Sequence, residues 1–346
     1  MNKVIELLKR RPKFGLALIA RYYPLNEQDL DKFGDKLNWT LISSNHKINW
    51  STELIEKFAD RFDWEILSYN PYFNWSEALI DQFAEYWNVR TLCENESIPW
   101  TADIIRKHED FWVWELISTN KKMPWSVEFI GEFKDRLDFG YLSTNPALNW
   151  SEELIEAFAD YWDWESLAAN PGLPWDLALV EKHLDKWSWQ SLVTNEALPW
   201  KEIQEKYPEE IDMWFASGNP GFPWTKEIIE QNQNDINFEI LSAVSGLPWS
   251  EELIDKFKDH WHWGDFGIST NEAIPWTDEL IAKYQDKLDF FADFGLAGNL
   301  SLPWSVKLLE DYKDVWNWSR LSLNRVLWEK VFQAHIQKFN LNDLIE

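Results

Sequence analysis

Apolar residues recur along this chain with helical spacing, in a pattern about 25 residues long. Counted from a leading tryptophan at position 0, they occupy positions 0, 4, 5, 8 and 12. These positions form one face of a helix with 3.6 residues per turn. In the copy at residues 150–174 they are Trp150, Leu154, Ile155, Phe158 and Trp162. With Ser151 as a favourable N-cap, the pattern predicts a first helix of about eleven residues.

A second, shorter helix is predicted to follow each first helix. In the same copy Asp163 is placed to cap it, and Trp164 and Leu167 lie three residues apart on one face. Asn170 and Pro171 then end it, because Asn tolerates the left-handed conformation at a helix end and Pro cannot continue a helix. This second helix is expected to have about seven residues.

The leading tryptophans recur over nearly the whole chain at intervals of 24 to 28 residues. They are Trp50, Trp75, Trp100, Trp125, Trp150, Trp175, Trp200, Trp224, Trp249, Trp276, Trp304 and Trp328. The phase continues to the N-terminus, where Val4 and Leu8 match Leu54 and Phe58. A short unit of this kind buries its apolar face only against its neighbours. The pattern therefore predicts an all-α solenoid, a superhelical array of about thirteen 25-residue repeats with a Trp-rich core.

We expect a single repeat domain over residues 1–346. The apolar stretch at 14–20 keeps the repeat phase and is interpreted as core rather than as part of a signal peptide. Pro208 is expected to stop or kink the helix that contains it. The predicted segments are a basic N-terminal capping unit at 1–24, regular repeats at 25–199, irregular repeats with insertions at 200–303, and the last repeat with a C-terminal cap at 304–346.

The repeat anchors are predicted from the same periodicity. They are Trp50, Trp75, Trp100, Trp125, Trp150, Trp175 and Trp200, with Asn70, Asn95, Asn120, Asn145 and Asn170. A buried indole N–H needs an acceptor, which a recurrent Asn or Ser, or a carbonyl at a helix end, supplies. We expect the asparagines from Asn45 to Asn219 to form a ladder between units. Tryptophans at positions 0 and 14 are expected in the core, and position 12 is expected to be only partly covered.

A leucine-rich repeat is the alternative fold, because its period of 20–29 residues also admits 25. That motif needs apolar residues three and five before the Asn. Here Leu167 lies three before Asn170, but Glu165 lies five before it and the other apolar residue, Trp164, lies six before. A spacing of three is helical rather than alternating, which favours the helical array.

Two blocks carry a resemblance to a known class of proteins. They are LPWSEELIDKF at 247–257 and WDWESLAAN at 162–170, and variants of both recur along nearly the whole chain. The chain thereby resembles the tryptophan-rich short-repeat proteins of bacteria and some large DNA viruses. That class has no common activity, so the resemblance implies only an interaction role.

The composition of the 346-residue chain excludes several classes of function. With 33 basic and 59 acidic residues its net charge is −26, which disfavours duplex DNA and anionic membranes as partners. The single cysteine, Cys93, excludes a disulfide framework and is expected to be a small packed residue, since Ser68 and Ser118 take its place in other units. No apolar run approaches the length of a membrane span.

The motifs of catalysis and cofactor binding are missing from the sequence. It contains no glycine-rich phosphate loop, and the GDFG at 264–267 lacks the other kinase motifs. His260 and His262 would diverge on a helix and are not expected to share a metal. Every other candidate side chain is repeated rather than unique. We therefore predict no catalytic residues, no cofactor and no metal site, and a protein that is not an enzyme.

Two sets of residues are predicted as a partner-binding surface. Asp110, Asp135, Asp160 and Asp185 recur at position 10 and would form an acidic row, interpreted either as a solubilising face or as a site for a basic partner. Asp265, Phe266, Phe291 and Phe294 lie where the units starting at Trp249 and Trp276 gain residues. Such insertions map to loops on one face of a solenoid, and this face often binds.

These patterns lead to one functional hypothesis and two alternatives. The hypothesis is a cytoplasmic, non-enzymatic scaffold that binds another protein with a basic or mixed surface. The alternatives are an acidic inhibitor that mimics nucleic acid and a carbohydrate-binding protein. Residues 1–24 carry six basic groups against Glu6, and this basic end suggests a monomer or a weak end-to-end oligomer.

Overall fold

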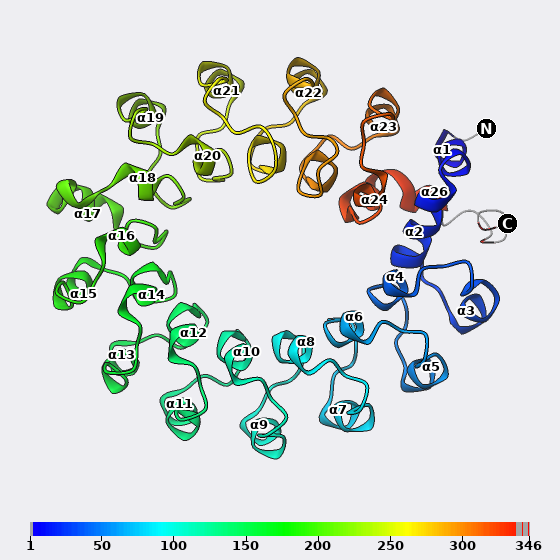
Figure 1. The fold of residues 1–346 in the computed structure, drawn as a ribbon, viewed down its shortest axis with the longest axis horizontal. Helices are drawn as coiled ribbons and strands as arrows, with labels where there is room; N and C mark the ends of the chain where they lie inside the picture. Colours follow the sequence, from blue (N-terminus) through cyan, green and yellow to red (C-terminus); the bar gives the residue numbers. More distant parts are fainter. Residues whose placement is uncertain (1–2, 337–340, 342–344, 346) are drawn as a thin grey trace. The chain divides into compact units, whose positions relative to one another are not determined.

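The computed structural model describes residues 3–336, 341 and 345, and it is an all-helical repeat array (Figure 1). No strand occurs in these described residues. The chain divides into two compact units. One covers residues 49–212, and the other joins residues 1–48 to residues 213–346.

In the unit at 49–212 the first helices of the repeats form one row and the second helices another (Figure 1). The first helices are α5 (Thr52–Lys57), α7 (Glu77–Gln82), α9 (Ala102–Lys107), α11 (Val127–Phe133), α13 (Glu152–Ala157), α15 (Leu177–Lys182) and α17 (Trp200–Lys206). The second helices are α6 (Trp64–Ser68), α8 (Val89–Glu94), α10 (Trp114–Thr119), α12 (Phe139–Thr144), α14 (Trp164–Ala169) and α16 (Trp189–Leu192). The 3₁₀ helix η1 (Pro208–Glu210) follows α17, so the helix stops before Pro208 as predicted.

The other unit contains both ends of the chain. Its N-terminal helices are α1 (Lys3–Arg10), α2 (Pro12–Tyr22), α3 (Glu27–Phe33) and α4 (Trp39–Ser43). Its later repeats contain α18 (Met213–Ala216), α19 (Lys226–Gln231), α20 (Phe238–Leu241), α21 (Glu251–Lys256), η2 (Ile268–Thr270), α22 (Asp278–Tyr284), η3 (Leu296–Gly298), α23 (Val306–Asp311) and α24 (Trp318–Leu321). The described part of its C-terminal end is α25 (Arg325–Leu327), the π-helical η4 (Trp328–Phe332) and α26 (Gln333–Ile336).

The helices begin where the sequence predicts but are shorter. Ser151 caps α13 by accepting a hydrogen bond from the Leu154 N–H at 3.2 Å, and Asp163 caps α14. The expected length of about eleven residues for the first helix is wrong, since α13 has six, whereas α14, also with six, is close to the expected seven. The backbone tightens after Phe158, whose carbonyl accepts from the N–H groups of both Tyr161 and Trp162 at 2.9 and 3.3 Å. The apolar face therefore continues to Trp162 through hydrogen-bonded turns rather than through a regular helix.

Asparagine side chains tie each repeat to the one before it. The Asn170 Nδ2 group donates to the carbonyls of Ser143 and Asn145 at 2.8 and 3.2 Å. The carbonyl of Asn170 in turn accepts from the indole of Trp175 at 2.7 Å. We call this repeated set of bonds the asparagine ladder. It also links Asn95, Asn120, Asn145, Asn195, Asn271, Asn299 and Asn324 to the preceding repeat.

Trp162 at position 12 and Trp164 at position 14 have the reverse of their expected exposures, whereas Trp114, also at position 14, is buried as expected. Trp162, at position 12, is only 5% exposed and donates to the Ile155 carbonyl at 3.0 Å. Trp164, at position 14, is half-buried and contacts Trp187 of the next repeat with a centroid distance of 5.0 Å. Trp164 begins the second helix at the seam between two repeats, and part of its ring stays open to solvent. Trp162 packs on Trp150 of its own repeat and on Phe139 of the preceding one.

Cys93 is the small packed residue that the sequence predicts. It is fully buried, and its Sγ accepts a long hydrogen bond of 3.5 Å from the Val113 N–H. In the next repeat the Ser118 hydroxyl accepts from the Asp138 N–H in the same way. Burial raises the pKa of the Cys93 thiol to about 11, which disfavours the thiolate.

The basic N-terminal helices pack against the last repeats of the same chain. The Tyr22 ring stacks on Trp328 with a centroid distance of 5.5 Å, and Phe14 meets Trp318 edge-on at 5.2 Å. Arg10 forms an ion pair of 2.7 Å with Glu310. Residues 1–24 therefore use part of their positive charge within the chain, a contact that the sequence analysis does not predict.

Candidate protein-interaction surface

The two insertions in the later repeats close with similar backbone hydrogen bonds but differ in length and in the conformation of their phenylalanines. Each contains the sequence Asp-Phe-Gly, at 265–267 and at 293–295. After the first, the Ile268 N–H donates back to the His262 carbonyl at 2.8 Å, and after the second the Leu296 N–H donates to the Asp289 carbonyl at 2.7 Å. The backbone passes so close at Gly267 that an added Cβ would lie 2.2 Å from the His262 oxygen. Glycine is therefore required there.

The insertions bring two of the predicted surface residues into contact. Phe266 and Phe294 stack with their ring centroids 4.8 Å apart and their planes inclined by 29°. They are 64% and 50% exposed, and Phe291 is 71% exposed. We call these three residues the aromatic patch. Large apolar side chains grouped on a surface are unusual in a soluble protein and often mark an interaction site.

Phe266 also has an unusual backbone conformation. Its φ is +56°, and among the described residues it is the one non-glycine residue with positive φ. The left-handed region costs an L-residue with a bulky side chain about 1–2 kcal/mol. Since the Phe266 ring is exposed, burial of the ring does not offset this cost. A strained conformation that presents an apolar side chain to solvent is typical of a functional site rather than of a folding requirement.

Charged groups border the aromatic patch. The Arg320 guanidinium lies 5.8 Å from the Phe294 ring centroid. The Asn317 Nδ2 group donates to the Phe291 carbonyl at 2.8 Å and to the Asp293 carboxylate at 3.4 Å. Asp265 is half-buried, and its carbonyl lies 2.7 Å from the His262 Nε2 atom. The patch thus combines an apolar centre with the Asp293 carboxylate and the Arg320 cation at its border.

Exposed apolar residues continue along the same row of second helices in this unit. Trp214 of α18 is 54% exposed and Ile240 of α20 is 46% exposed. The C-terminal end of α18 reaches α20, since a Cβ at Gly218 would lie 3.2 Å from the Ile240 side chain. The sequence analysis placed its candidate surface in these irregular repeats but did not single out Trp214, Ile240 or Arg320.

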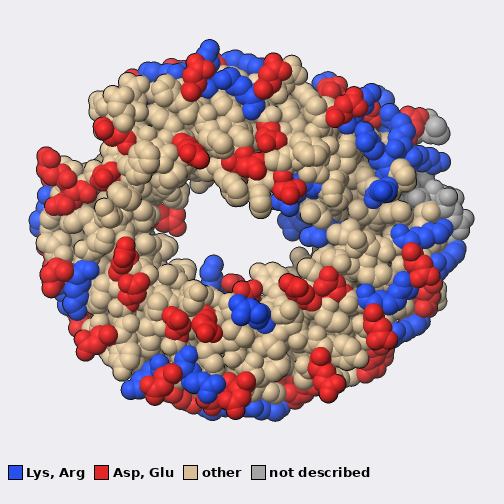
Figure 2. Space-filling view, in the orientation of Figure 1, with Lys and Arg blue, Asp and Glu red and all other residues tan. Residues whose placement is uncertain are grey.

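The predicted acidic row lies in the unit at 49–212, and basic side chains lie beside its carboxylates. Asp110, Asp135, Asp160 and Asp185 are all exposed. Arg136 lies 3.5 Å from Asp110 and 3.2 Å from Glu109, so a cation stands beside the row. Figure 2 shows Lys and Arg side chains interspersed with Asp and Glu along the first helices of this unit. The exposure of the four aspartates agrees with the expected acidic row, and its use as a solubilising face or as a partner site stays a prediction.

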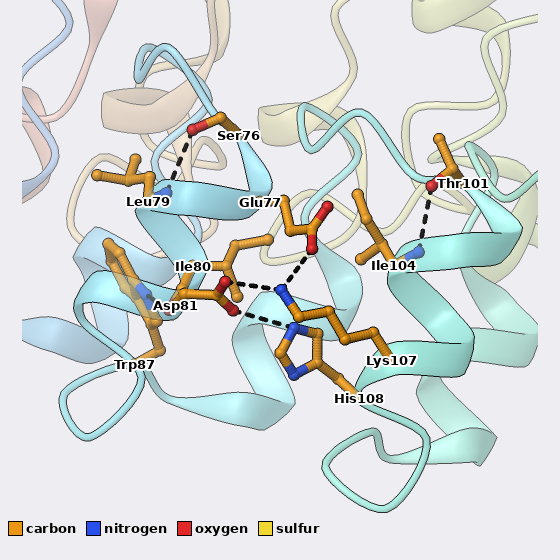
Figure 3. A network of polar contacts seen from close by, with 10 residues as sticks. All are labelled: Ser76, Glu77, Leu79, Ile80, Asp81, Trp87, Thr101, Ile104, Lys107 and His108. Carbon is orange, nitrogen blue, oxygen red and sulfur yellow. Dashed lines mark hydrogen bonds and ion pairs between the residues drawn. The ribbon is translucent and has the colours of Figure 1, made fainter.

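One cluster of side chains in the described residues has the composition of a metal site. The ligand atoms of Glu77, Asp81 and His108 all lie within 4.8 Å of one another. N-capping of α7 by Ser76 and of α9 by Thr101 fixes the two helices that carry them (Figure 3).

A lysine already occupies the centre of that cluster. The Lys107 ammonium donates to Asp81 at 2.8 Å and also contacts Glu77 (Figure 3). It holds the pKa of the Asp81 carboxyl below its usual range. His108 Nε2 lies 3.1 Å from the same carboxylate. Because one ammonium group contacts both carboxylates and offsets one of their two negative charges, we describe the cluster as an ion-pair network between repeats rather than as a metal centre.

Comparisons with protein-family models, curated proteins and solved structures find no match to this chain. The resemblance to tryptophan-rich repeat proteins therefore stays a prediction. None of the helices in the described ranges has both the length and the apolar character needed to cross a bilayer. The functional argument consequently rests on the aromatic patch and its surroundings.

Proposed function

We propose that this protein is a non-enzymatic scaffold that binds another protein through the aromatic patch. The observation that carries the proposal is the exposure of Phe266, Phe291 and Phe294, at 64%, 71% and 50%. Interfaces gain most of their binding energy from a few large side chains that become fully buried, and aromatic residues are prominent among them. The strained backbone of Phe266 and the turn that requires Gly267 further support a surface that serves binding.

The charge around the patch favours a partner with a basic or mixed surface. Asp265 and Asp293 belong to the insertions themselves, and the whole chain carries a net charge of −26. Complementary charge accelerates encounter and aligns the partner, while the apolar contact supplies the affinity. The expected ligand is a segment with an aromatic or aliphatic anchor flanked by Lys or Arg. A cytoplasmic location is part of the proposal, in keeping with the single free cysteine.

The two alternative functions have less support. A nucleic-acid mimic needs regularly spaced negative charge, whereas Arg136 pairs with carboxylates beside the acidic row. A sugar-binding platform needs several accessible tryptophan faces, whereas Trp50, Trp125 and Trp162 are buried in the repeat core and Trp214 is the one tryptophan of the described residues that is more than half exposed. We therefore place the interaction at the aromatic patch.

Selection from a random peptide library tests this proposal without a known partner. The bait is the full chain, compared with the F266S/F291S/F294S variant and with the Tyr141→Ser variant, which removes an exposed aromatic residue of the other unit. We expect the natural chain and Tyr141→Ser to enrich the same peptides, with an aromatic or aliphatic residue near Lys or Arg. The triple variant should lose them, while its circular dichroism stays unchanged. Equal enrichment by all three baits, or no enrichment by any of them, contradicts the proposal.

A further inference from the structure

A cavity of about 550 Å³ opens where the two ends of the chain meet. It lies within the unit that joins residues 1–48 to residues 213–346, and its walls come from α2, the start of α4, and α24. Its volume falls in the range of small-molecule sites. Because one wall comes from the N-terminal helices and another from the last repeats, the cavity depends on the contact between them.

The charge of the cavity is opposite to that of the chain. Lys13 of α2 and Lys36, just before α4, both line it, and no carboxylate side chain is among its lining residues. The chain as a whole has 59 acidic residues against 33 basic ones. Figure 2 shows Lys and Arg side chains gathered over the N-terminal helices. A pocket with two ammonium groups and no acid attracts an anion.

The start of α2 adds to the positive potential. This helix of 11 residues has no acidic residue in its first turn, and Arg11 at its N-cap makes no side-chain capping bond. Lys13 lies in that first turn, where the helix dipole disfavours a cation. In contrast, α13 begins with Glu152 and Glu153. An anion in the cavity would relieve the unfavourable placement of Lys13.

The remaining walls offer hydrogen bonds and apolar contact. Asn38 accepts from the Leu41 N–H at 3.1 Å through Oδ1, so the group it can offer a ligand is its Nδ2 donor. On the α24 side the Ser322 hydroxyl already donates to the Ser319 carbonyl at 2.6 Å, so the hydroxyl offered to a ligand there is that of Ser319. Leu16 and Leu323 supply apolar surface on opposite walls. A ligand with one charged group and a short apolar body would use both kinds of wall.

We propose that this cavity binds a small organic anion, a phosphate monoester with a short apolar body, with Lys13 and Lys36 as its charge partners. Bound there, the anion contacts α2 and α24 together and so stabilises the packing of the first helices on the last repeats. The site is separate from the aromatic patch and does not depend on the proposed function.

Thermal unfolding and calorimetry of the full chain test the proposal with defined probes. The probes are phenyl phosphate, inorganic phosphate and phenol. We expect phenyl phosphate to raise the melting temperature as its concentration rises, because a ligand of the folded state stabilises that state by mass action. Inorganic phosphate should bind more weakly because it lacks the apolar body, and uncharged phenol should have no effect.

Two variants decide whether the cavity is responsible. K13Q/K36Q should weaken phenyl phosphate binding by about tenfold or more, since a charge-assisted contact is lost at each lysine. K47Q/K201Q, which changes two exposed lysines outside the lining, should bind as the natural chain does. No binding of phenyl phosphate to the natural chain overturns the proposal. Equal binding to both double variants, or an equal response to phenol, also overturns it.

Discussion

The ring of Tyr22 stacks on the ring of Trp328, with centroids 5.5 Å apart and planes inclined by 19°. These residues are separated by nearly the whole chain, yet both are buried in the contact between its first helices and its last repeats. The Tyr22 hydroxyl also donates to the Leu323 carbonyl at 2.6 Å. One residue thus joins the two ends by an apolar and a polar contact.

Removing the Tyr22 ring should therefore loosen the N-terminal helices. We expect Tyr22→Ala to lower the free energy of unfolding by about 3–5 kcal/mol, because a large buried side chain is lost. Tyr22→Phe should cost about 1 kcal/mol, since only the hydrogen bond is lost. Denaturant unfolding gives both values, and hydrogen exchange should show lost protection in α1 and α2. Unchanged protection of these helices in Tyr22→Ala argues against a stabilising contact, and Tyr69→Ala, at an exposed tyrosine, is the control.

Loss of one rung of the asparagine ladder should cost more than loss of a surface charge. Asn170→Ala removes the amide donor of the Ser143 and Asn145 carbonyls, leaving two buried acceptors without that partner. Two net hydrogen bonds and the desolvation of their partners amount to about 2–4 kcal/mol. Glu153→Ala, on the exposed side of α13, is the matched control. Melting temperatures of the two variants that differ by less than their error would refute the role of the ladder.

Adding a methyl group at two glycines should have opposite effects. At Gly267 the Cβ would lie 2.2 Å from the His262 oxygen, so Gly267→Ala should destabilise the chain by about 1–3 kcal/mol. At Gly131, in the interior of α11, the nearest atom is 4.0 Å away, and Gly131→Ala should stabilise it by about 0.5–1 kcal/mol. Denaturant unfolding measures both changes. A neutral Gly267→Ala would show that the insertion does not need its close turn.

Cys93 should make stability fall at high pH. Burial raises the pKa of its thiol from 9.0 to about 11, so the folded state holds its proton more tightly than the unfolded state. The contribution of this group is complete below pH 9.0 and is lost as pH rises toward about 11. Cys93→Ser should remove this part of the fall, and the smaller polar side chain suits a position that is Ser118 or Ser143 elsewhere. Parallel pH profiles for the two proteins would show that the thiol does not titrate in this way.

Much of the repeat could be predicted because its signals are local. Ser151 and Asp163 cap the predicted helices, and Pro208 follows the end of α17. The helix lengths could not be predicted from local signals. After Phe158 the apolar residues keep the spacing of a helix, but the backbone there forms turns. The exposures of Trp162 and Trp164 were reversed because they depend on contacts with the neighbouring repeats, at Phe139 and Trp187, which periodicity does not place.

The candidate site was predictable only as an interruption of the period. Inserted residues drew attention to Asp265, Phe266, Phe291 and Phe294. Phe266 and Phe294 come into contact through two Asp-Phe-Gly insertions in successive repeats, and the repeat period alone does not specify this contact. The cavity beside Lys13 needs the packing of α2 on α24, which lie at opposite ends of the sequence, and no local signal specifies that packing.

The bonds at Asn145 have a consequence for how such an array changes over evolutionary time. Its one carbonyl accepts from the Trp150 indole and from the Asn170 amide, which both belong to the following repeat. Each junction between repeats that has this asparagine therefore uses the same groups, namely an Asn carbonyl as acceptor and the next repeat's Trp indole and Asn amide as donors. A whole repeat can be duplicated or deleted by unequal recombination. The repeats on either side then form the same hydrogen bonds with each other, and no compensating mutation is needed.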